Sequence, residues 1–243
     1  MIRTALYAGT RNLYNDMVVC AKSLLYHNGA DQVYFLTEDD TFPEDLPECI
    51  STINVSGQQY FPRTGPNYNS SWTYMVLIRT ALPFIFPELD RILVLDCDTI
   101  VNKDISFLWN VDISNHYYAM VEEKQITNRT HPYYNFGVAV HNLAKLRDGT
   151  ADVIIRTINT VQLPYCEQDA VNSVCRKHIL ELPPEYNATF FNVPHIPDGQ
   201  EVIKHYAACR PFNTKPGYTT YNALTWEQVM SMKEKGGIDN YEE

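Results

Sequence analysis

The chain has 243 residues and a formal net charge of -10, and 45% of its residues are hydrophobic and 12% aromatic. This composition predicts a folded globular protein with a large core, and the acidic balance argues against nucleic acid and anionic membranes as partners. No apolar run reaches the roughly 18 residues of a transmembrane helix, and the first residues do not form a signal sequence. We therefore expect a cytoplasmic protein without a transmembrane segment, folded as one domain over residues 1–243.

The six cysteines are scattered along the chain and include no Cys-x-x-Cys pair. Zinc sites and disulfide frameworks use cysteines in recognisable, closely spaced patterns. The distribution therefore predicts reduced thiols, several of them buried, rather than either kind of site.

The first part of the chain alternates between apolar runs and a helical pattern. Residues 4–8 predict a buried strand, and after a polar turn the apolar positions from Tyr14 to His27 follow a helical period. Strands are expected at 32–36 and 50–55, a loop at 57–69, and a helix at about 71–82 that Pro83 ends or kinks. A strand, a polar turn and a helix are typical of a nucleotide-binding βα unit, although the sequence has neither Gly-x-Gly-x-x-Gly nor a Walker loop.

The run from Ile92 to Leu95 predicts a strand buried on both faces, and Asp96 and Asp98 follow it directly. Side chains two apart in an extended chain point the same way, so we expect the two carboxylates to converge while Cys97 faces away. Hard oxygen ligands suit Mg²⁺ or Mn²⁺, which keep further positions for phosphate oxygens. Because open α/β sheets bind ligands at strand carboxyl ends, the pattern favours a metal site for a nucleotide over a surface turn with two acids.

The rest of the chain continues the alternation of strands and helices. We expect strands at 117–121, 134–141, 179–182 and 202–206, a short turn or helix at 104–109, and helices at 143–147, 153–161, from 167 onward, and 225–235. A polar loop is predicted at 125–132. The strand at 134–141 is interrupted at 135–137, where Gly137 permits close approach of backbone and ligand.

Some charged residues allow two interpretations. Arg79 either snorkels at the surface or presents its guanidinium to a phosphate or sugar. Glu167 and Asp169 lie in the first turn of a predicted helix, where the helix dipole favours acids without any functional role. His205 is equally well interpreted as an ordinary, partly buried histidine.

Several short motifs occur in an order that resembles glycosyltransferase family 8, the retaining group with a GT-A fold that includes bacterial lipooligosaccharide galactosyltransferases and glycogenin. The motifs are Arg79 in its helix, Leu95-Asp96-Cys97-Asp98-Thr99, Tyr134-Asn135-Phe136-Gly137-Val138, Glu167-Gln168-Asp169-Ala170-Val171-Asn172, Leu182-Pro183 to Tyr186-Asn187, and His205-Tyr206-Ala207-Ala208-Cys209-Arg210-Pro211-Phe212. The resemblance implies an α/β protein with a single Rossmann-like mixed sheet flanked by helices. It also implies a catalytic core at about 4–212, followed by a carboxyl-terminal helix and acidic tail at 213–243.

The resemblance further implies an enzyme that transfers glucose or galactose, with retention, from UDP-glucose or UDP-galactose to a hydroxyl of an unidentified carbohydrate or protein acceptor. The implied cofactor is Mn²⁺ or Mg²⁺. The implied residues are Asp96, Asp98 and His205 for the metal; Ala8, Thr10, Tyr14, Asp96, Cys97 and Asp98 for the nucleotide; Arg79, Glu122, Asn135, Glu167 and Gln168 for the donor sugar; and Gln168, Glu167 and Arg210 for catalysis.

The implied mechanism depends on Gln168, which would lie at the face of the sugar opposite the leaving group. An amide is a poor nucleophile, so the acceptor is expected to attack from the leaving-group side through an oxocarbenium-like transition state. Three residues depart from the motif near the carboxyl end of the core: Ala208 replaces a glycine, Arg210 a lysine and Phe212 a tryptophan, and the segment is one residue short. A guanidinium still offers charge and a fork to phosphate.

Two other functions fit parts of the pattern. A haloacid-dehalogenase-like phosphatase is suggested by Asp-Cys-Asp-Thr after a buried strand, but Thr99 comes one position early and the motif lies far from the amino terminus. A UDP-sugar hydrolase or a catalytically silent UDP-sugar-binding protein would keep the same nucleotide and metal residues. Transfer to an acceptor rather than to water distinguishes the transferase.

Overall fold

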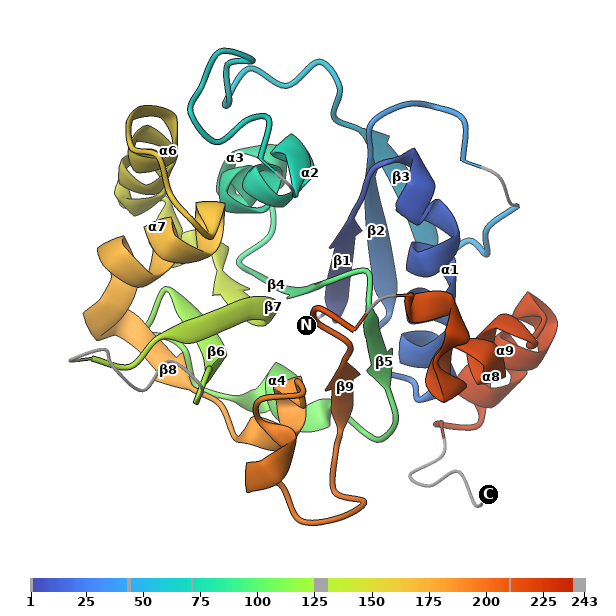
Figure 1. The fold of residues 1–243 in the computed structure, drawn as a ribbon. Coiled ribbons are helices and arrows are strands. Elements are labelled where there is room, and N and C mark those ends of the chain that lie inside the picture. The colour runs from blue at the N-terminus through green and yellow to red at the C-terminus, as the bar shows by residue number, and fades with distance from the viewer. Residues whose placement is uncertain (1, 43–44, 71, 125–130, 210, 238–243) are drawn as a thin grey trace.

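The computed structural model describes residues 2–42, 45–70, 72–124, 131–209 and 211–237. Within these ranges a seven-stranded sheet has the order β3-β2-β1-β4-β7-β6-β8 (Figure 1). The strands are β1 (Thr4–Ala8), β2 (Gln32–Thr37), β3 (Ile50–Asn54), β4 (Arg91–Leu95), β6 (Tyr118–Glu122), β7 (Tyr134–Asn142) and β8 (Ile179–Glu181). Strand β7 is antiparallel to both β4 and β6, and the other neighbours are parallel, which confirms the mixed sheet.

Helices cover both faces of this sheet (Figure 1). On one face lie α1 (Tyr14–Tyr26), α4 (Ser106–Asn110), α8 (Pro216–Asn222) and α9 (Trp226–Glu234), with a small sheet of β5 (Thr99–Val101) and β9 (Ile203–His205). On the other face lie α2 (Thr73–Leu77), α3 (Leu82–Ile85), α5 (Leu143–Leu146), α6 (Thr150–Thr160) and α7 (Cys166–Cys175). Short 3-10 turns are η1 (Arg11–Leu13), η2 (Ile78–Ala81), η3 (Arg176–His178), η4 (Pro184–Asn187), η5 (Val193–His195) and η6 (Phe212–Thr214).

Strand β4 is buried on both faces, as its apolar run predicts. Leu93 and Leu95 pack in the core on the α1 side, whereas Ile92 and Val94 pack in the core on the α7 side. Alternation along an extended chain produces this division.

One edge of the sheet collects the carboxyl ends of β1, β4 and β6 and the start of the antiparallel β7. Open α/β folds bind ligands at such an edge.

The structure differs from the predicted elements in three places. Asp96 to Asp98 form a turn between β4 and β5, not a continuation of the strand, because the chain leaves the main sheet there to pair with β9. The three-residue strand β5 and helix α8 were not predicted, because both are too short for a clear periodic signal. Pro83 does not end its helix; it lies at the start of α3, where a missing N–H costs little, after the 3-10 turn η2.

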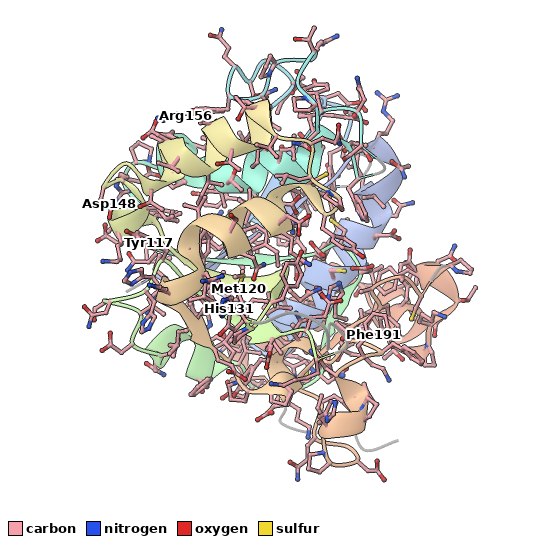
Figure 2. The ribbon with its side chains drawn as sticks, turned by 60° about the vertical axis from the view of Figure 1, so that its left-hand side comes forward. Tyr117, Met120, His131, Asp148, Arg156 and Phe191 are labelled. Carbon is pink, nitrogen blue, oxygen red and sulfur yellow. The ribbon has the colours of Figure 1, made fainter. Side chains whose placement is uncertain are left out.

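The segment just before β6 is hydrogen-bonded to the turn that follows α5. The hydroxyl of Tyr117, just before β6, donates to Asp148 at 2.9 Å in the turn after α5 (Figure 2).

The six cysteines are all free, and three of them are buried, as predicted. Among the described residues, no helix is both long enough and apolar enough to cross a bilayer.

Candidate metal centre and active site

The turn with Asp96 and Asp98 is held from three sides. The Asp96 N–H donates to the carbonyl of Gly137 in β7 at 2.8 Å, and the Thr99 hydroxyl donates to the Asp96 carbonyl at 2.8 Å. The Tyr206 N–H donates to the Asp98 carbonyl at 2.9 Å. The backbone that carries both carboxylates is thus fixed by β7 and by the residue after β9.

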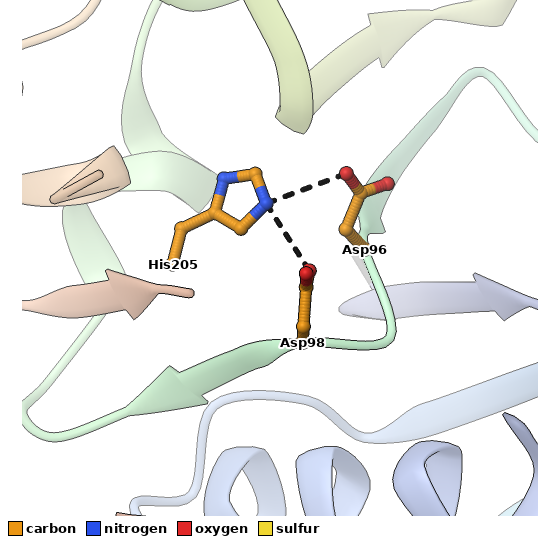
Figure 3. A group of neighbouring side chains, drawn as sticks. All are labelled: Asp96, Asp98 and His205. Carbon is orange, nitrogen blue, oxygen red and sulfur yellow. Dashed lines mark ion pairs between the residues drawn. The ribbon is translucent and has the colours of Figure 1, made fainter. Parts of the chain in front are cut away.

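Strand pairing brings His205 to these carboxylates from more than 100 positions away in the sequence. Thr99 pairs with His205 in the β5–β9 sheet. The Nε2 atom of His205 lies 3.4 Å from an oxygen of Asp96 and 3.2 Å from an oxygen of Asp98 (Figure 3). One ligand atom from each of the three residues lies within 4.8 Å of the other two. The three predicted metal ligands therefore converge.

The second ring nitrogen of His205 has its own buried partner. Nδ1 lies 2.8 Å from the side-chain oxygen of Asn187, whose amide nitrogen donates to Asn135 at 2.8 Å. An oxygen partner requires a proton on Nδ1, which leaves Nε2 as the ring atom that could bind a cation once its own proton is displaced. Such a partner is typical of metal-binding histidines, because it fixes the ring's orientation and tautomer.

The local charges also suit a cation. Burial lowers the pKa of His205, but Asp98 and hydrogen bonds to both carboxylates outweigh it and raise this pKa to about 10. Burial opposes ionisation of Asp96, yet Arg79 and His205 hold its pKa below the ordinary value. Two carboxylates and one imidazole form a donor set that accepts Mn²⁺ or Mg²⁺. The residues fit a divalent cation.

We expect Mn²⁺ affinity to rise with pH. Without a cation, His205 is protonated below its pKa of about 10, so the ion must displace that proton. Between pH 6 and 8 the affinity should increase by about 10-fold per pH unit. Calorimetry at pH 6, 7 and 8 measures this slope, and a flat profile would show that His205 is not a ligand.

Gly137 provides the space for this cluster. A Cβ at this position would lie 2.7 Å from an Asp96 oxygen and would overlap the His205 ring. The β6–β7 pairing also shifts register here, since Met120 pairs with Ala139 but Val121 with Asn135. Strand β7 is irregular where an interruption was predicted, but it continues through residues 135–137 without a break. Gly137 closely approaches the Asp96 and His205 side chains, and its approach to a ligand stays a prediction.

Replacing Gly137 with alanine should therefore displace two of the metal ligands. We expect at least a 10-fold weaker Mn²⁺ affinity, on the order of the cost of overpacking, about 1–3 kcal/mol. Titration of Mn²⁺ against both proteins measures the loss. Gly57→Ala is the matched control, because a Cβ there would meet nothing within 4 Å, and equal effects of the two substitutions would contradict the steric explanation.

Arg79 is buried, with only 4% of its surface exposed, so it does not snorkel. Its guanidinium forms ion pairs with Asp96 on one side and Glu167 on the other, and lies 5.2 Å from the ring centre of Phe136. Burial raises the pKa of Glu167, against the effect of Arg79. A buried cation thus joins the metal centre to helix α7, which carries Glu167.

Helix α7 also positions Gln168 beside β7. The Gln168 oxygen accepts from the Phe136 N–H at 2.9 Å, and its amide nitrogen donates to the hydroxyl of Tyr133 at 3.2 Å. Asn135 lies in the same group and donates to Glu123 at 3.3 Å, and Gln168 approaches Glu123 at 3.5 Å.

The acid in this group is Glu123 and not the predicted Glu122, which forms an ion pair with Lys124. Glu123 was not predicted, although the two acids are adjacent in the sequence. Because side chains alternate at the end of β6, only the register of the sheet distinguishes them.

Of the residues predicted for the nucleotide, Ala8, Thr10 and Tyr14 lie along the first βα turn, and Cys97 contacts it. The Cys97 thiol donates to the Ala8 carbonyl at 3.3 Å, so Cys97 faces away from the metal ligands, as predicted. Tyr14 donates to Asp39 at 3.2 Å. Asp39 follows β2 at the same sheet edge and was not predicted. The Thr10 hydroxyl donates to Asn12 at 2.5 Å in the same turn.

The segment after β9 is described only in part. Ala208, which replaces a motif glycine, has a φ angle of 60°. This is the left-handed region of backbone conformation, which glycine adopts without strain. The predicted catalytic Arg210 lies outside the described residues.

Comparisons with known proteins give a consistent result. The family model for glycosyl transferase family 8 matches residues 5–208. The lipopolysaccharide 1,2-glucosyltransferase of Escherichia coli is 30% identical over 205 residues, which is 77% of this chain and 57% of that protein. The chain spans about half the length of curated relatives that it matches, between 45% and 57% for three of them.

Two solved structures share the fold. Glycosyltransferase GlyE of Streptococcus pneumoniae superimposes with a TM-score of 0.72 at 17% identity, covering 100% of this chain and 66% of that one. Galactosyltransferase LgtC, crystallised with donor and acceptor sugar analogs, superimposes with a TM-score of 0.68 at 17% identity, covering 94% of this chain and 99% of that one. At these identities the likeness shows the GT-A fold, which confirms the predicted fold class.

Proposed function

Because the chain belongs to glycosyl transferase family 8, we propose that it is a retaining hexosyltransferase with UDP-glucose or UDP-galactose as donor. The observation that carries this proposal is the convergence of Asp96, Asp98 and His205 within 4.8 Å. Arg79 and helix α7 lie directly beside this cluster. A nucleoside diphosphate sugar can bind through a divalent cation on its phosphates and polar groups around its sugar, and this arrangement of residues supports such a donor.

The residues divide into three groups along the donor. Ala8, Thr10 and Tyr14 would receive the uridine at the first βα turn, as the family resemblance implies. Asp96, Asp98 and His205 would hold a divalent cation, which neutralises the charge that develops on a departing diphosphate. Glu167, Gln168, Asn135 and Glu123 would surround the hexose.

The bonds of Gln168 support attack from the leaving-group side. Its oxygen already accepts a hydrogen bond from the Phe136 N–H, and an amide is a poor nucleophile in any case. In the proposed reaction the acceptor hydroxyl oxygen bonds to the sugar C1 as the bond from C1 to the phosphate oxygen breaks. The hydroxyl proton passes to that oxygen, and the products are the glycosylated acceptor and UDP.

The test is release of UDP from a panel of UDP-sugars, with Mn²⁺ and after chelation. We expect slow, metal-dependent release from UDP-glucose or UDP-galactose, because water substitutes poorly for the acceptor, and faster release when an acceptor is added. Release that no acceptor stimulates would favour the hydrolase. If no donor is cleaved and none binds with Mn²⁺, the proposal fails.

A further inference from the structure

A pocket of about 590 Å³ lies beside the metal centre, on the side of β9. This volume is within the range of small-molecule sites. His205 is its one contact with the proposed metal ligands, and the proposed sugar-binding residues do not line it. The pocket is therefore adjacent to the donor site and distinct from it.

The lining combines apolar and basic groups. Phe190, Phe191 and Val193 come from the segment between β8 and β9, in which Phe191 is labelled in Figure 2. Lys204 and Lys215 also line the pocket, and neither forms an ion pair with a described residue. The chain has a net charge of -10, but these two lysines beside aromatic rings make the pocket locally positive. Glu201 is the single acid of the lining and offsets this positive charge only in part.

The wall of the pocket is held in place by the same residues that orient His205. The His205 N–H donates to the Ala188 carbonyl at 3.2 Å, and buried Asn192 donates from its side chain to the Asn187 carbonyl at 3.2 Å. Asn187 in turn contacts His205 at Nδ1. A pocket wall fixed in this way loses little entropy when a ligand binds.

We propose that this pocket binds the acceptor substrate, and that the acceptor combines an apolar portion with a phosphate or carboxylate group. The inference rests on the proposed function, because attack from the leaving-group side requires the acceptor to enter beside the metal ligands, and His205 belongs both to that cluster and to the lining of the pocket. The aromatic wall contacts the apolar portion. Lys204 and Lys215 pair with the anionic group.

Calorimetry with three probes tests the acceptor class without requiring turnover. The probes are octyl phosphate, octyl glucoside and inorganic phosphate, the first two below their micelle concentrations. We expect octyl phosphate to bind at least about 10-fold tighter than either of the others, since it alone meets both the rings and the lysines. Octyl phosphate that binds no tighter than octyl glucoside would overturn the proposal, and so would inorganic phosphate that binds as tightly.

Substitutions locate the binding. Lys204→Gln combined with Lys215→Gln should abolish the advantage of octyl phosphate over octyl glucoside, and Phe191→Ser should weaken both alkyl probes. Lys177→Gln combined with Lys235→Gln, at two exposed lysines outside the pocket, makes the same change in charge and should leave all affinities unchanged. Equal effects of the two lysine pairs would contradict the assignment.

Binding of UDP with Mn²⁺ to each variant separates this inference from the proposed function. We expect it to be retained in the Lys204, Lys215 and Phe191 variants. Retained nucleotide binding with no preference for octyl phosphate defeats the acceptor assignment alone, whereas loss of nucleotide binding in the unsubstituted protein defeats the transferase itself.

Discussion

Arg79→Met is expected to lower the free energy of unfolding by about 3 kcal/mol at pH 7. The substitution removes a buried guanidinium and leaves the two carboxylates that pair with it without a positive partner. The methionine keeps the volume of the side chain, so lost packing contributes little. Asp96 and Glu167 are the carboxylates that lose their partner. Denaturant unfolding measures the change.

The loss should depend on pH. Burial already raises the pKa of Glu167, and removal of Arg79 raises it further. A raised pKa in the folded state stabilises the protein at low pH and less so as the pH rises, so the deficit of the variant should shrink between pH 7 and pH 5. Arg147→Met is the control, since its ion pair with Asp90 is largely exposed and should contribute less than about 1 kcal/mol. A deficit equal to that of the control would show that Arg79 is not a buried charge.

Asp98→Asn should reduce kcat/KM for Mn²⁺-dependent UDP-sugar turnover by about 1,000-fold. The amide keeps the shape of the side chain but removes one of the two negative charges that would hold the cation. The turn itself should persist, because the hydrogen bond from the Tyr206 N–H to the Asp98 carbonyl does not depend on the side chain. Steady-state kinetics measures the loss, and circular dichroism checks the fold.

Asp152→Asn, at an exposed acid of α6, makes the same change of charge away from the site and should retain full activity. An Asp98 variant with near-normal, metal-dependent turnover would contradict the metal assignment. An unfolded variant would instead assign Asp98 a structural role.

Much of the fold could be predicted because its signals are local. The four apolar residues of β4 identify a strand buried on both faces, and the structure divides them between two cores. Gly137 could also be interpreted correctly, since a glycine inside a strand indicates close approach. The ordered motifs then supplied the family, which periodicity alone does not reveal.

The remainder depends on pairing that no short stretch of sequence contains. His205 reaches the acids only because Thr99 pairs with it between two three-residue strands. The burial of Arg79 requires two carboxylates from separate elements. Likewise, Glu123 and not Glu122 meets Gln168 because of a register that the sequence leaves open.

The central claim is that Asp96, Asp98 and His205 hold a divalent cation to which UDP binds. Titration with Mn²⁺, followed by electron paramagnetic resonance with and without UDP, tests it most directly, because bound Mn²⁺ loses the sharp signal of the free ion. We predict one bound Mn²⁺ per chain, tighter in the presence of UDP and lost in Asp98→Asn. Absence of binding in the unsubstituted protein, or unchanged binding in the variant, would contradict the account.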